Sequence, residues 1–441
     1  MTLTIGVFDV DATPPVPSPL AYQTAVGVTD PLSCRGLVLS GDFGRVVLCA
    51  VDWIGISNGG HRRWQEALAR GAGVGVESVS THTLHPHDTP IYDADADAVL
   101  TSIGQGGQAF DGPFVDGLLD RVTAAVATAV RDAAPVSHIG LGAAPVRQVA
   151  SNRRVLDERG MVPKNRMSSC KDPDLQAAPE GVIDPNARVI AFYEGDRLVA
   201  SVSYYATHPQ SYYLQALVTP DFVGLARNEH EQRSGAPAIH FCGASGNVAA
   251  GKYNDGSHEM RPVLTERLAA GLDAALADAA QHRTPISDDQ VGWSQRLVHL
   301  PLAEYLRDGA AQRNFEADPT FRLARSVVWA RRCEEGDPVA VSCLRLGDAR
   351  VLHWPGELFV EYQLASQALR PDLFVVNAAY ADFAPGYIGT RVAYPQGGYE
   401  VGPVSRVSPD VEDVLWATAG ELLDADISGA RAPSDFTETR G

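Results

Sequence analysis

The chain has 441 residues, 45% of them hydrophobic, and is therefore long enough to bury a substantial core as one large unit or as two domains. Its 36 Lys and Arg side chains against 54 Asp and Glu give a formal net charge of −18 at pH 7, which would repel nucleic-acid phosphates and anionic lipid surfaces. We expect a small-molecule partner, with neither nucleic acid nor membrane bound, and the composition leaves the oligomeric state open.

The cysteines and the N-terminus favour an intracellular protein. The six cysteines have no C-x-x-C spacing and lie mostly in apolar runs such as RVVLCAVDW, which is typical of reduced core thiols. The first residues, MTLTIGVFDVDATPP, contain neither a basic region nor a long apolar stretch, and no run of about 18 apolar residues occurs. We therefore expect a cytoplasmic protein.

Strand-like and helix-like runs alternate from the N-terminal end onwards. Residues 45–53 (RVVLCAVDW) are typical of a buried strand, GGHRRWQEALARGAG of a helix, and 76–83 (VESVSTHT) of the next strand. This alternation predicts an α/β fold in which helices cover a mixed sheet core.

The segment at the end of the second strand, THTLHPHDTP, concentrates polar side chains. It holds His82, His85 and His87 just before Asp88. Loops after strand ends are where such folds place their chemistry, so we expect this loop to be functional.

The middle of the chain adds covering helices, an irregular segment and a second strand end that bears a histidine. Residues 111–135 and 264–281 have apolar residues at helical spacing, whereas 151–186 has little periodicity and many Pro, Asp and Arg. A long irregular segment inside a compact domain is often a functional loop. Residues 188–209 predict a β-hairpin that brings His208 to a strand end. We find no internal sequence repeat.

Several of these strand ends offer groups that bind metals. Catalytic zinc sites use three His or carboxylate ligands and leave one position open for water. The candidates are His82, His85, His87, His208 and Glu357, with Tyr387 in a Gly-rich loop. A lone histidine at a strand end is more often structural, and no H-E-x-x-H pattern is complete within one element. Three histidines in one loop nevertheless favour a metal site.

Residues 240–257 (HFCGASGNVAAGKYNDGS) suggest two other chemistries. A strand running into G-A-S-G-N is similar to the nucleophile elbow of serine esterases at Ser245, but Asn247 stands where G-x-S-x-G requires its last glycine. The spacing from Gly246 to Lys252 matches a phosphate-binding loop, but Tyr253 replaces the required Ser or Thr. A serine esterase is the weaker alternative, and a nucleotide site is disfavoured.

Short motifs in chain order resemble the catalytic domain of the neutral/alkaline (non-lysosomal) ceramidase family. The resemblance covers nearly the whole chain and is carried by VDATPP, VTDPLSCRGLVL, STHTLHPHDTP, NRR (152–154), YYATHPQSYY, TPDFVGLAR, CGASGNVAAGKYNDG, WPGELFVEYQ, APGYIGT and GGYE. It implies a single large catalytic domain over 1–430, followed by a polar tail at 431–441, without the family's C-terminal immunoglobulin-like domain.

The resemblance also implies one Zn²⁺ per chain and cleavage of an amide or related acyl bond. In the family the ion is held by the first histidine of H-T-H, the histidine of Y-A-x-H-P, the glutamate of P-G-E and a later tyrosine. These fall on His82, His208, Glu357 and Tyr387. Alternatively, Tyr387 donates a hydrogen bond to a developing oxyanion.

Proton transfer and substrate binding are assigned to other residues of the same motifs. His85, His87 and Asp88 are candidates for the general base, and we prefer His85 because imidazole titrates in the useful range. Substrate binding is expected of residues in N-R and the two later motifs, namely Asn152, Arg153, Lys252, Tyr253, Asn254 and Tyr399. For Arg153 the alternative is a merely structural ion pair.

Two positions depart from the family and argue against long-chain ceramide as substrate. Leu84 stands in place of the second H-T-H histidine, and Ala249 in place of a serine. The hypothesis is therefore a zinc-dependent hydrolase that cleaves an amide or related acyl bond in a soluble small molecule. The alternative is a metal-containing binding protein that has lost catalysis, because a fold does not by itself preserve the reaction of its relatives.

Overall fold

The structure, a computed structural model, describes residues 2–437 and is built from three units of the same topology. Each unit has three consecutive antiparallel strands, a helix, a fourth strand parallel to the third, and a closing helix. The first unit contains β1 (Thr4–Asp11), β3 (Ser33–Gly41), β4 (Gly44–Val51), α1 (Asn58–Ala72), β6 (Val79–Thr83) and α3 (Gly112–Arg131). The second contains β9 (His138–Pro145), β11 (Asn186–Glu194), β12 (Arg197–Tyr205), α5 (Asp221–Ser234), β14 (Ala238–Cys242) and α6 (Met260–Gln281). The third contains β17 (Val291–Val298), β18 (Val339–Leu346), β19 (Ala349–His353), α9 (Val360–Leu369), β21 (Phe374–Ala378) and α11 (Val411–Leu422).

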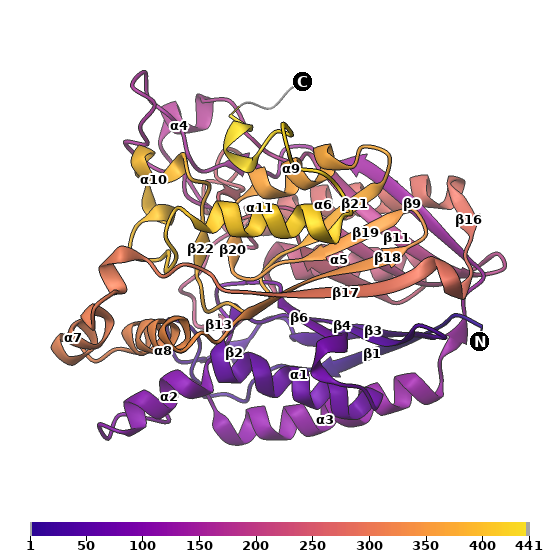
Figure 1. Ribbon diagram of the computed structural model, residues 1–441, viewed down its shortest axis with the longest axis horizontal. Coiled ribbons are helices and arrows are strands. Elements are labelled where there is room, and N and C mark those ends of the chain that lie inside the picture. Colours follow the sequence, from indigo (N-terminus) through magenta and orange to yellow (C-terminus); the bar gives the residue numbers. More distant parts are fainter. Residues whose placement is uncertain (1, 438–441) are drawn as a thin grey trace.

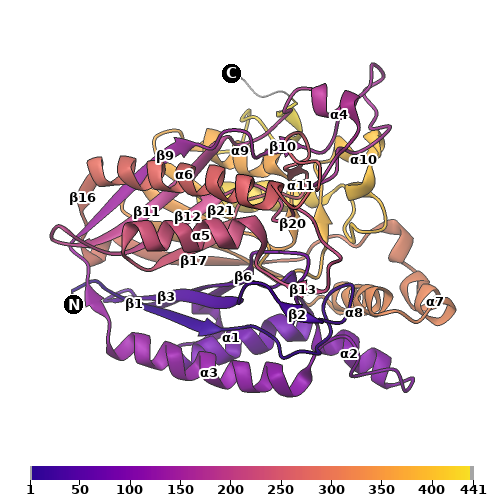
Figure 2. The same cartoon turned by 180° about the vertical axis from the view of Figure 1, so that it is seen from behind.

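Helices cover one face of each sheet, and the sheets enclose the core between them. Figure 1 shows α1 and α3 on the outer face of the first sheet, and Figure 2 shows α5 and α6 over the second. Helices α9 and α11 pack on the third sheet. Short edge strands, β8 (Ala134–Pro135) and β16 (Arg283–Pro285), extend the first two sheets. The predicted mixed sheet core covered by helices is confirmed.

The first, third and fourth strands of each unit run in the same direction, so their carboxyl ends share one edge of the sheet. The segments that follow these ends pair with one another in short ladders. The pairs are β5 (Gly55–Ile56) with β7 (Ile91–Tyr92), β10 (Ser151–Asn152) with β15 (Val248–Ala249), β13 (Leu217–Val218) with β2 (Gly27–Val28), and β20 (Glu357–Leu358) with β22 (Tyr387–Ile388). The same segments contain α2 (Ala94–Thr101), α4 (Pro173–Ala177), α7 (Ala310–Ala317), α8 (Phe321–Glu335) and α10 (Ala393–Gln396). The inserted segments of all three units therefore gather at one end of the sheets.

The elements predicted from sequence periodicity are present. The apolar run 45–53 contains β4, whose alternate side chains pack on opposite faces of its sheet, as its period of two requires. The two long helical patterns are α3 and α6, and the predicted hairpin is β11 and β12, joined at Gly195 with a positive φ of 59°. The repeated topology was not visible in the sequence, because the units share strand order rather than residues.

The C-terminal segment that was predicted to be a polar tail begins with ordered contacts. Ser434 Oγ donates a hydrogen bond to Glu412 on α11 at 2.6 Å, and Phe436 packs against the core. Residues 438–441 of the predicted tail lie outside the described residues. Over residues 2–437, every helix is too short or too polar to cross a bilayer.

Glycines let the closing helices approach the first strands closely. A Cβ added to Gly6 on β1 would lie 1.9 Å from the carbonyl oxygen of Ala129 on α3, and one added to Gly142 on β9 would lie 2.2 Å from that of Ala275 on α6. Both obstacles are helix backbone, which cannot rotate away. The lack of a side chain at these two glycines therefore sets the distance between the closing helix and the sheet in the first two units.

We expect Gly142→Ala to lower the free energy of unfolding by about 1–3 kcal/mol, because the methyl group must push α6 off the sheet. The measurement is urea unfolding of the purified protein. Gly112→Ala is the matched control, since a Cβ there meets nothing within 4 Å. Equal unfolding midpoints for the two variants would contradict the close-packing argument.

Candidate functional site

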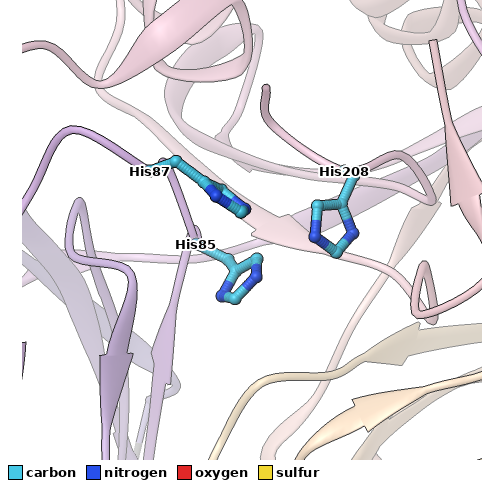
Figure 3. Close-up of side chains that lie close together, drawn as sticks. All are labelled: His85, His87 and His208. Carbon is cyan, nitrogen blue, oxygen red and sulfur yellow. The ribbon is translucent and has the colours of Figure 1, made fainter. Parts of the chain in front are cut away.

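Three histidines come together where the first and second units meet. His85 and His87 follow β6, and His208 follows β12. One ring nitrogen from each residue lies within 4.8 Å of the other two, and Figure 3 shows the three rings gathered around a common centre. This spacing makes the group a candidate metal site.

Hydrogen bonds to the scaffold orient two of these rings. His85 Nδ1 donates to the carbonyl oxygen of Ile54 at 2.5 Å, and His208 Nδ1 donates to that of Ser245 at 3.2 Å. A carbonyl oxygen can only accept, so the ring proton lies on Nδ1 and the lone pair of Nε2 is free to bind at the centre. Metal-binding histidines are commonly held in this way.

His87 completes the group with less support from the scaffold. Its Nδ1 lies 3.4 Å from the Tyr22 hydroxyl, and its Nε2 is buried without a hydrogen-bond partner among residues 2–437. Burial lowers the pKa of His87 and of His208 well below the usual range. Both rings are therefore neutral, which is the form that binds a metal or accepts a proton.

Glu357 brings a carboxylate to the same centre. Its Oε2 is 3.3 Å from His85 Nε2 and 3.6 Å from His208 Nε2, and it has no hydrogen-bond partner in the described part of the chain. A buried carboxylate without a partner is unfavourable, and a divalent cation between it and the neutral imidazoles would remove that cost. The donor set fits an ion such as Zn²⁺, which prefers histidine and carboxylate ligands.

The structure does not bring His82 to this centre, which corrects the ligand predicted from the H-T-H motif. His82 Nδ1 donates to the Ala379 carbonyl at 2.6 Å, and its Nε2 lies 2.9 Å from His353 Nδ1. Both nitrogens thus contact protein groups, and burial lowers the pKa of the ring to about 3. From this loop, the histidines that reach the centre are His85 and His87. His85 has a φ of 70°, a conformation that is uncommon outside glycine.

Tyr387, Arg153 and Tyr399 lie beside Glu357 as a connected group. Tyr387 is paired with Glu357 across the β20–β22 ladder, and its hydroxyl accepts a hydrogen bond from Arg153 Nη1 at 3.1 Å. The Arg153 guanidinium also lies 5.6 Å from the Tyr399 ring centroid and pairs with Glu400 at 3.3 Å. Arg153 therefore makes the predicted ion pair and, in addition, orients the Tyr387 phenol.

A cavity of about 250 Å³ opens onto the centre and is lined by His85, His87, Glu357, Tyr387 and Tyr399. Other residues that line it, among them Tyr22, Arg322, Arg325, Phe383 and Arg406, were not predicted from the sequence. No motif marks them, because they come one or two at a time from separate segments. A larger cleft of about 860 Å³ lies among α2, α7 and α8, but its described walls contain neither histidine nor cysteine, so the smaller cavity is the candidate site.

Four predicted substrate-binding residues do not line the cavity, which corrects their assignment. Three of them, Lys252, Tyr253 and Asn254, instead attach the irregular segment 151–186 to the loop after β15, whereas the Asn152 side chain bonds within that segment. The hydrogen bonds run from Asn152 to Val182, from Lys252 to Gln176 and Ala178, from Tyr253 to Glu180, and from Asn254 to Ser168 and Ser211.

Asp88 is likewise structural rather than a general base. Its carboxylate accepts hydrogen bonds from the backbone N–H of Leu214 at 3.0 Å and of Gln215 at 3.4 Å. It is absent from the described walls of the cavity. Asp88 therefore ties the histidine loop to the loop that follows His208.

The Ser245 segment is scaffold and lacks the setting of a nucleophile elbow. Ser245 is fully buried with its hydroxyl 2.7 Å from that of Tyr380, and the strand before it leads into β15 rather than into a helix. Asn247 Nδ2 donates to the Glu361 carboxylate at 2.8 Å, and its Oδ1 accepts from Val360 N–H at 2.9 Å. The G-A-S-G-N loop thus holds the segment that carries Glu357.

Comparisons with known proteins identify the fold. No family model and no curated protein matches the chain. The crystal structure of neutral ceramidase from Pseudomonas aeruginosa superposes with a TM-score of 0.69 and 18% identity, covering 98% of this chain and 77% of that chain. A structure of a ceramidase complexed with C2 also superposes with a TM-score of 0.69 and 18% identity, covering 96% of this chain and 74% of that chain. The chain therefore has a neutral ceramidase-like fold, as the motif resemblance predicted.

The Asn247–Glu361 contact predicts a pH dependence of stability. Burial raises the pKa of Glu361 to about 7 from its ordinary value of 4.5. Between these values the folded protein keeps a proton that the unfolded chain releases, so the free energy of unfolding falls as pH rises through this window. We expect Glu361→Gln to remove up to about 2 kcal/mol of the loss between pH 5 and pH 8. Urea unfolding of both proteins at the two pH values measures the difference, and parallel losses would refute the assignment.

Proposed function

We propose that this protein is a zinc-dependent hydrolase that cleaves an amide or related acyl bond of a small soluble molecule, with one ion per chain. The observation that carries the proposal is the convergence of donor atoms from His85, His208 and Glu357 beside a cavity. Glu357 Oε2 lies 3.3 Å from His85 Nε2 and 3.6 Å from His208 Nε2. The likeness of the fold to that of a neutral ceramidase favours an amide bond among the reactions that such a site can perform.

His85, His208 and Glu357 are the three ligands in this proposal, because three protein ligands leave a coordination position open for catalysis. A zinc ion held by these residues would supply Lewis-acid chemistry toward a carbonyl group and would lower the pKa of water to about 7. His87 then handles the proton. One of its ring nitrogens belongs to the same group, its Nε2 has no partner among the described residues, and its ring lines the cavity.

Tyr387 is proposed to stabilise the negative charge that develops on the carbonyl oxygen of the substrate. Arginine can only donate, so the hydrogen bond from Arg153 Nη1 uses the Tyr387 oxygen as acceptor and leaves the phenol hydrogen available to the cavity. Burial raises the pKa of Tyr387 well above its usual value, so the phenol stays a neutral donor. Arg153 acts through Tyr387 as a positioning residue.

The assignment of ligands and base is tested by metal content and turnover together. We expect about one zinc per chain in protein purified without chelators or a histidine tag, loss of that zinc in His208→Ala, and retention of it in His87→Ala. Both variants should lose turnover of an amide panel by at least about 100-fold, as is typical when a general base or a metal is removed. Elemental analysis by mass spectrometry and single-substrate kinetics are the measurements.

Thermal unfolding of each variant guards against misfolding in that experiment. Zinc lost equally from His87→Ala and His208→Ala would make His87 a ligand and overturn its role as base. Bound zinc without turnover on amides or esters would favour the metal-containing binding protein instead. Absence of zinc in the unmodified protein would overturn the proposal.

The role of Tyr387 predicts a selective loss of kcat. We expect Tyr387→Phe to lower kcat by about 100-fold with little change in KM, because the hydrogen bond is needed only as charge develops. Tyr399→Phe is the matched control from the same wall of the cavity, and its kcat should fall by less than about fivefold. Equal losses in the two variants would argue against an oxyanion contact.

A further inference from the structure

Three arginines line the cavity on the side away from the histidines. Arg322 and Arg325 lie on α8, and Arg406 lies in the segment after β21. The Phe383 ring contacts both His85 and Arg325, with its centroid 5.2 Å from that of His85 and 4.9 Å from Arg325 Cζ. A molecule that contacts the histidines and extends past Phe383 therefore meets guanidinium groups.

Arg406 is a buried cation without a carboxylate partner. It is 4% exposed, its Nε donates to Ser326 Oγ at 3.0 Å, and its Nη1 donates to the Ala384 carbonyl at 3.1 Å. Both acceptors are neutral, and in the described part of the chain no acidic group lies within ion-pair distance of this side chain. Burial, together with repulsion from Arg325, lowers the pKa of Arg406 to about 9. An unpaired buried charge is unfavourable, and a bound anion would relieve it.

Arg325 has only a partial counter-charge. It is 6% exposed, and its Nε lies 3.7 Å from the Asp93 carboxylate without a hydrogen bond. Arg325 thus has one buried carboxylate nearby and Arg406 has none within ion-pair distance among the described residues, so these two guanidiniums exceed their carboxylate by one positive charge. Arg322, at the exposed mouth, adds a third cation that makes no ion pair within residues 2–437.

We infer that the substrate carries a carboxylate, which binds to Arg406 and Arg325 while the scissile carbonyl lies at the histidines; N-acyl amino acids are the class that fits. A carboxylate supplies the counter-charge that Arg406 lacks, and the guanidinium fork binds carboxylates in a bidentate manner. The position of the scissile bond rests on the proposed function, whereas the binding of the anion does not. Phe383 and Phe321 provide apolar walls for the side chain of such a molecule.

The kinetic test uses matched pairs of N-acyl amino acids and their primary amides, such as N-acetylphenylalanine and N-acetylphenylalaninamide. We expect kcat/KM to be at least about tenfold higher for the acid, and Arg406→Met to reduce this ratio to near one. Arg331→Gln is the matched control, because Arg331 lies on the same helix but lines the other cleft. Its acid-to-amide ratio should be unchanged.

A binding experiment distinguishes failure of this inference from failure of the proposed hydrolysis, because it does not depend on turnover. Calorimetric titration with N-acetylglycinate and N-acetylglycinamide should show at least about tenfold tighter binding of the acid, lost in Arg406→Met, whether or not turnover occurs. Should Arg406→Met fail to fold, Arg322→Gln at the exposed mouth carries the test, with an expected loss of about threefold. Equal binding of acid and amide, or binding of neither, would overturn the inference. Tighter binding of an aminomethylphosphonate analogue than of the carboxylate would overturn the choice of carboxylate.

Discussion

The candidate site depends on two hydrogen bonds from histidine Nδ1 atoms to backbone carbonyls, those of His85 to Ile54 and of His208 to Ser245. Each bond fixes the tautomer and leaves Nε2 free to bind at the centre. Both carbonyls lie just beyond strand ends, Ile54 after β4 and Ser245 after β14. The chemistry of the rings is therefore set by where the strands of two units end, and any change that moves those ends would release the rings even with every ligand present.

The threefold topology explains why so many unrelated segments meet there. In each unit the carboxyl ends of three strands share an edge, so each unit inserts three segments at that end. Segments after the third and fourth strands contribute His208, Glu357, His85 and Tyr387. Segments after the first strands contribute Tyr22, Arg153 and the α8 arginines. Short connections close to the sheets are held rigidly, which suits groups that must keep a fixed geometry, whereas longer insertions shape the cavity around them.

The sequence predicted the elements and part of the site for identifiable reasons. His208, Glu357, Tyr387 and Tyr399 were assigned from the resemblance of their motifs to the ceramidase family, and the structure brings them to one centre and its cavity. His82 was misassigned because the ring that reaches the centre depends on the positive φ of His85, which no spacing reveals. Lys252 was assigned to substrate binding because a sequence does not show whether a lysine side chain is free to bind a ligand or is already hydrogen-bonded to the protein. The α8 arginines were invisible, since an arginine on a helix is ordinarily a solvated charge.

The cavity differs from the rest of the structure in how its buried arginines are compensated. Arg153 is compensated by Glu400, and Arg332 by Asp382 and Asp337, so most buried arginines here have full partners. Arg406 differs, since within residues 2–437 its side chain makes only two hydrogen bonds, both to neutral oxygens. Arg166 also lacks a carboxylate there, but its guanidinium donates to five backbone carbonyls. Arg406 is therefore retained at a cost in stability, and such costs are commonly found where a ligand supplies the missing partner. The unbalanced charge lies on a cavity wall formed by inserted segments, whereas the histidines lie close to strand ends. The reaction at the histidines and the choice of substrate therefore depend on different parts of the fold.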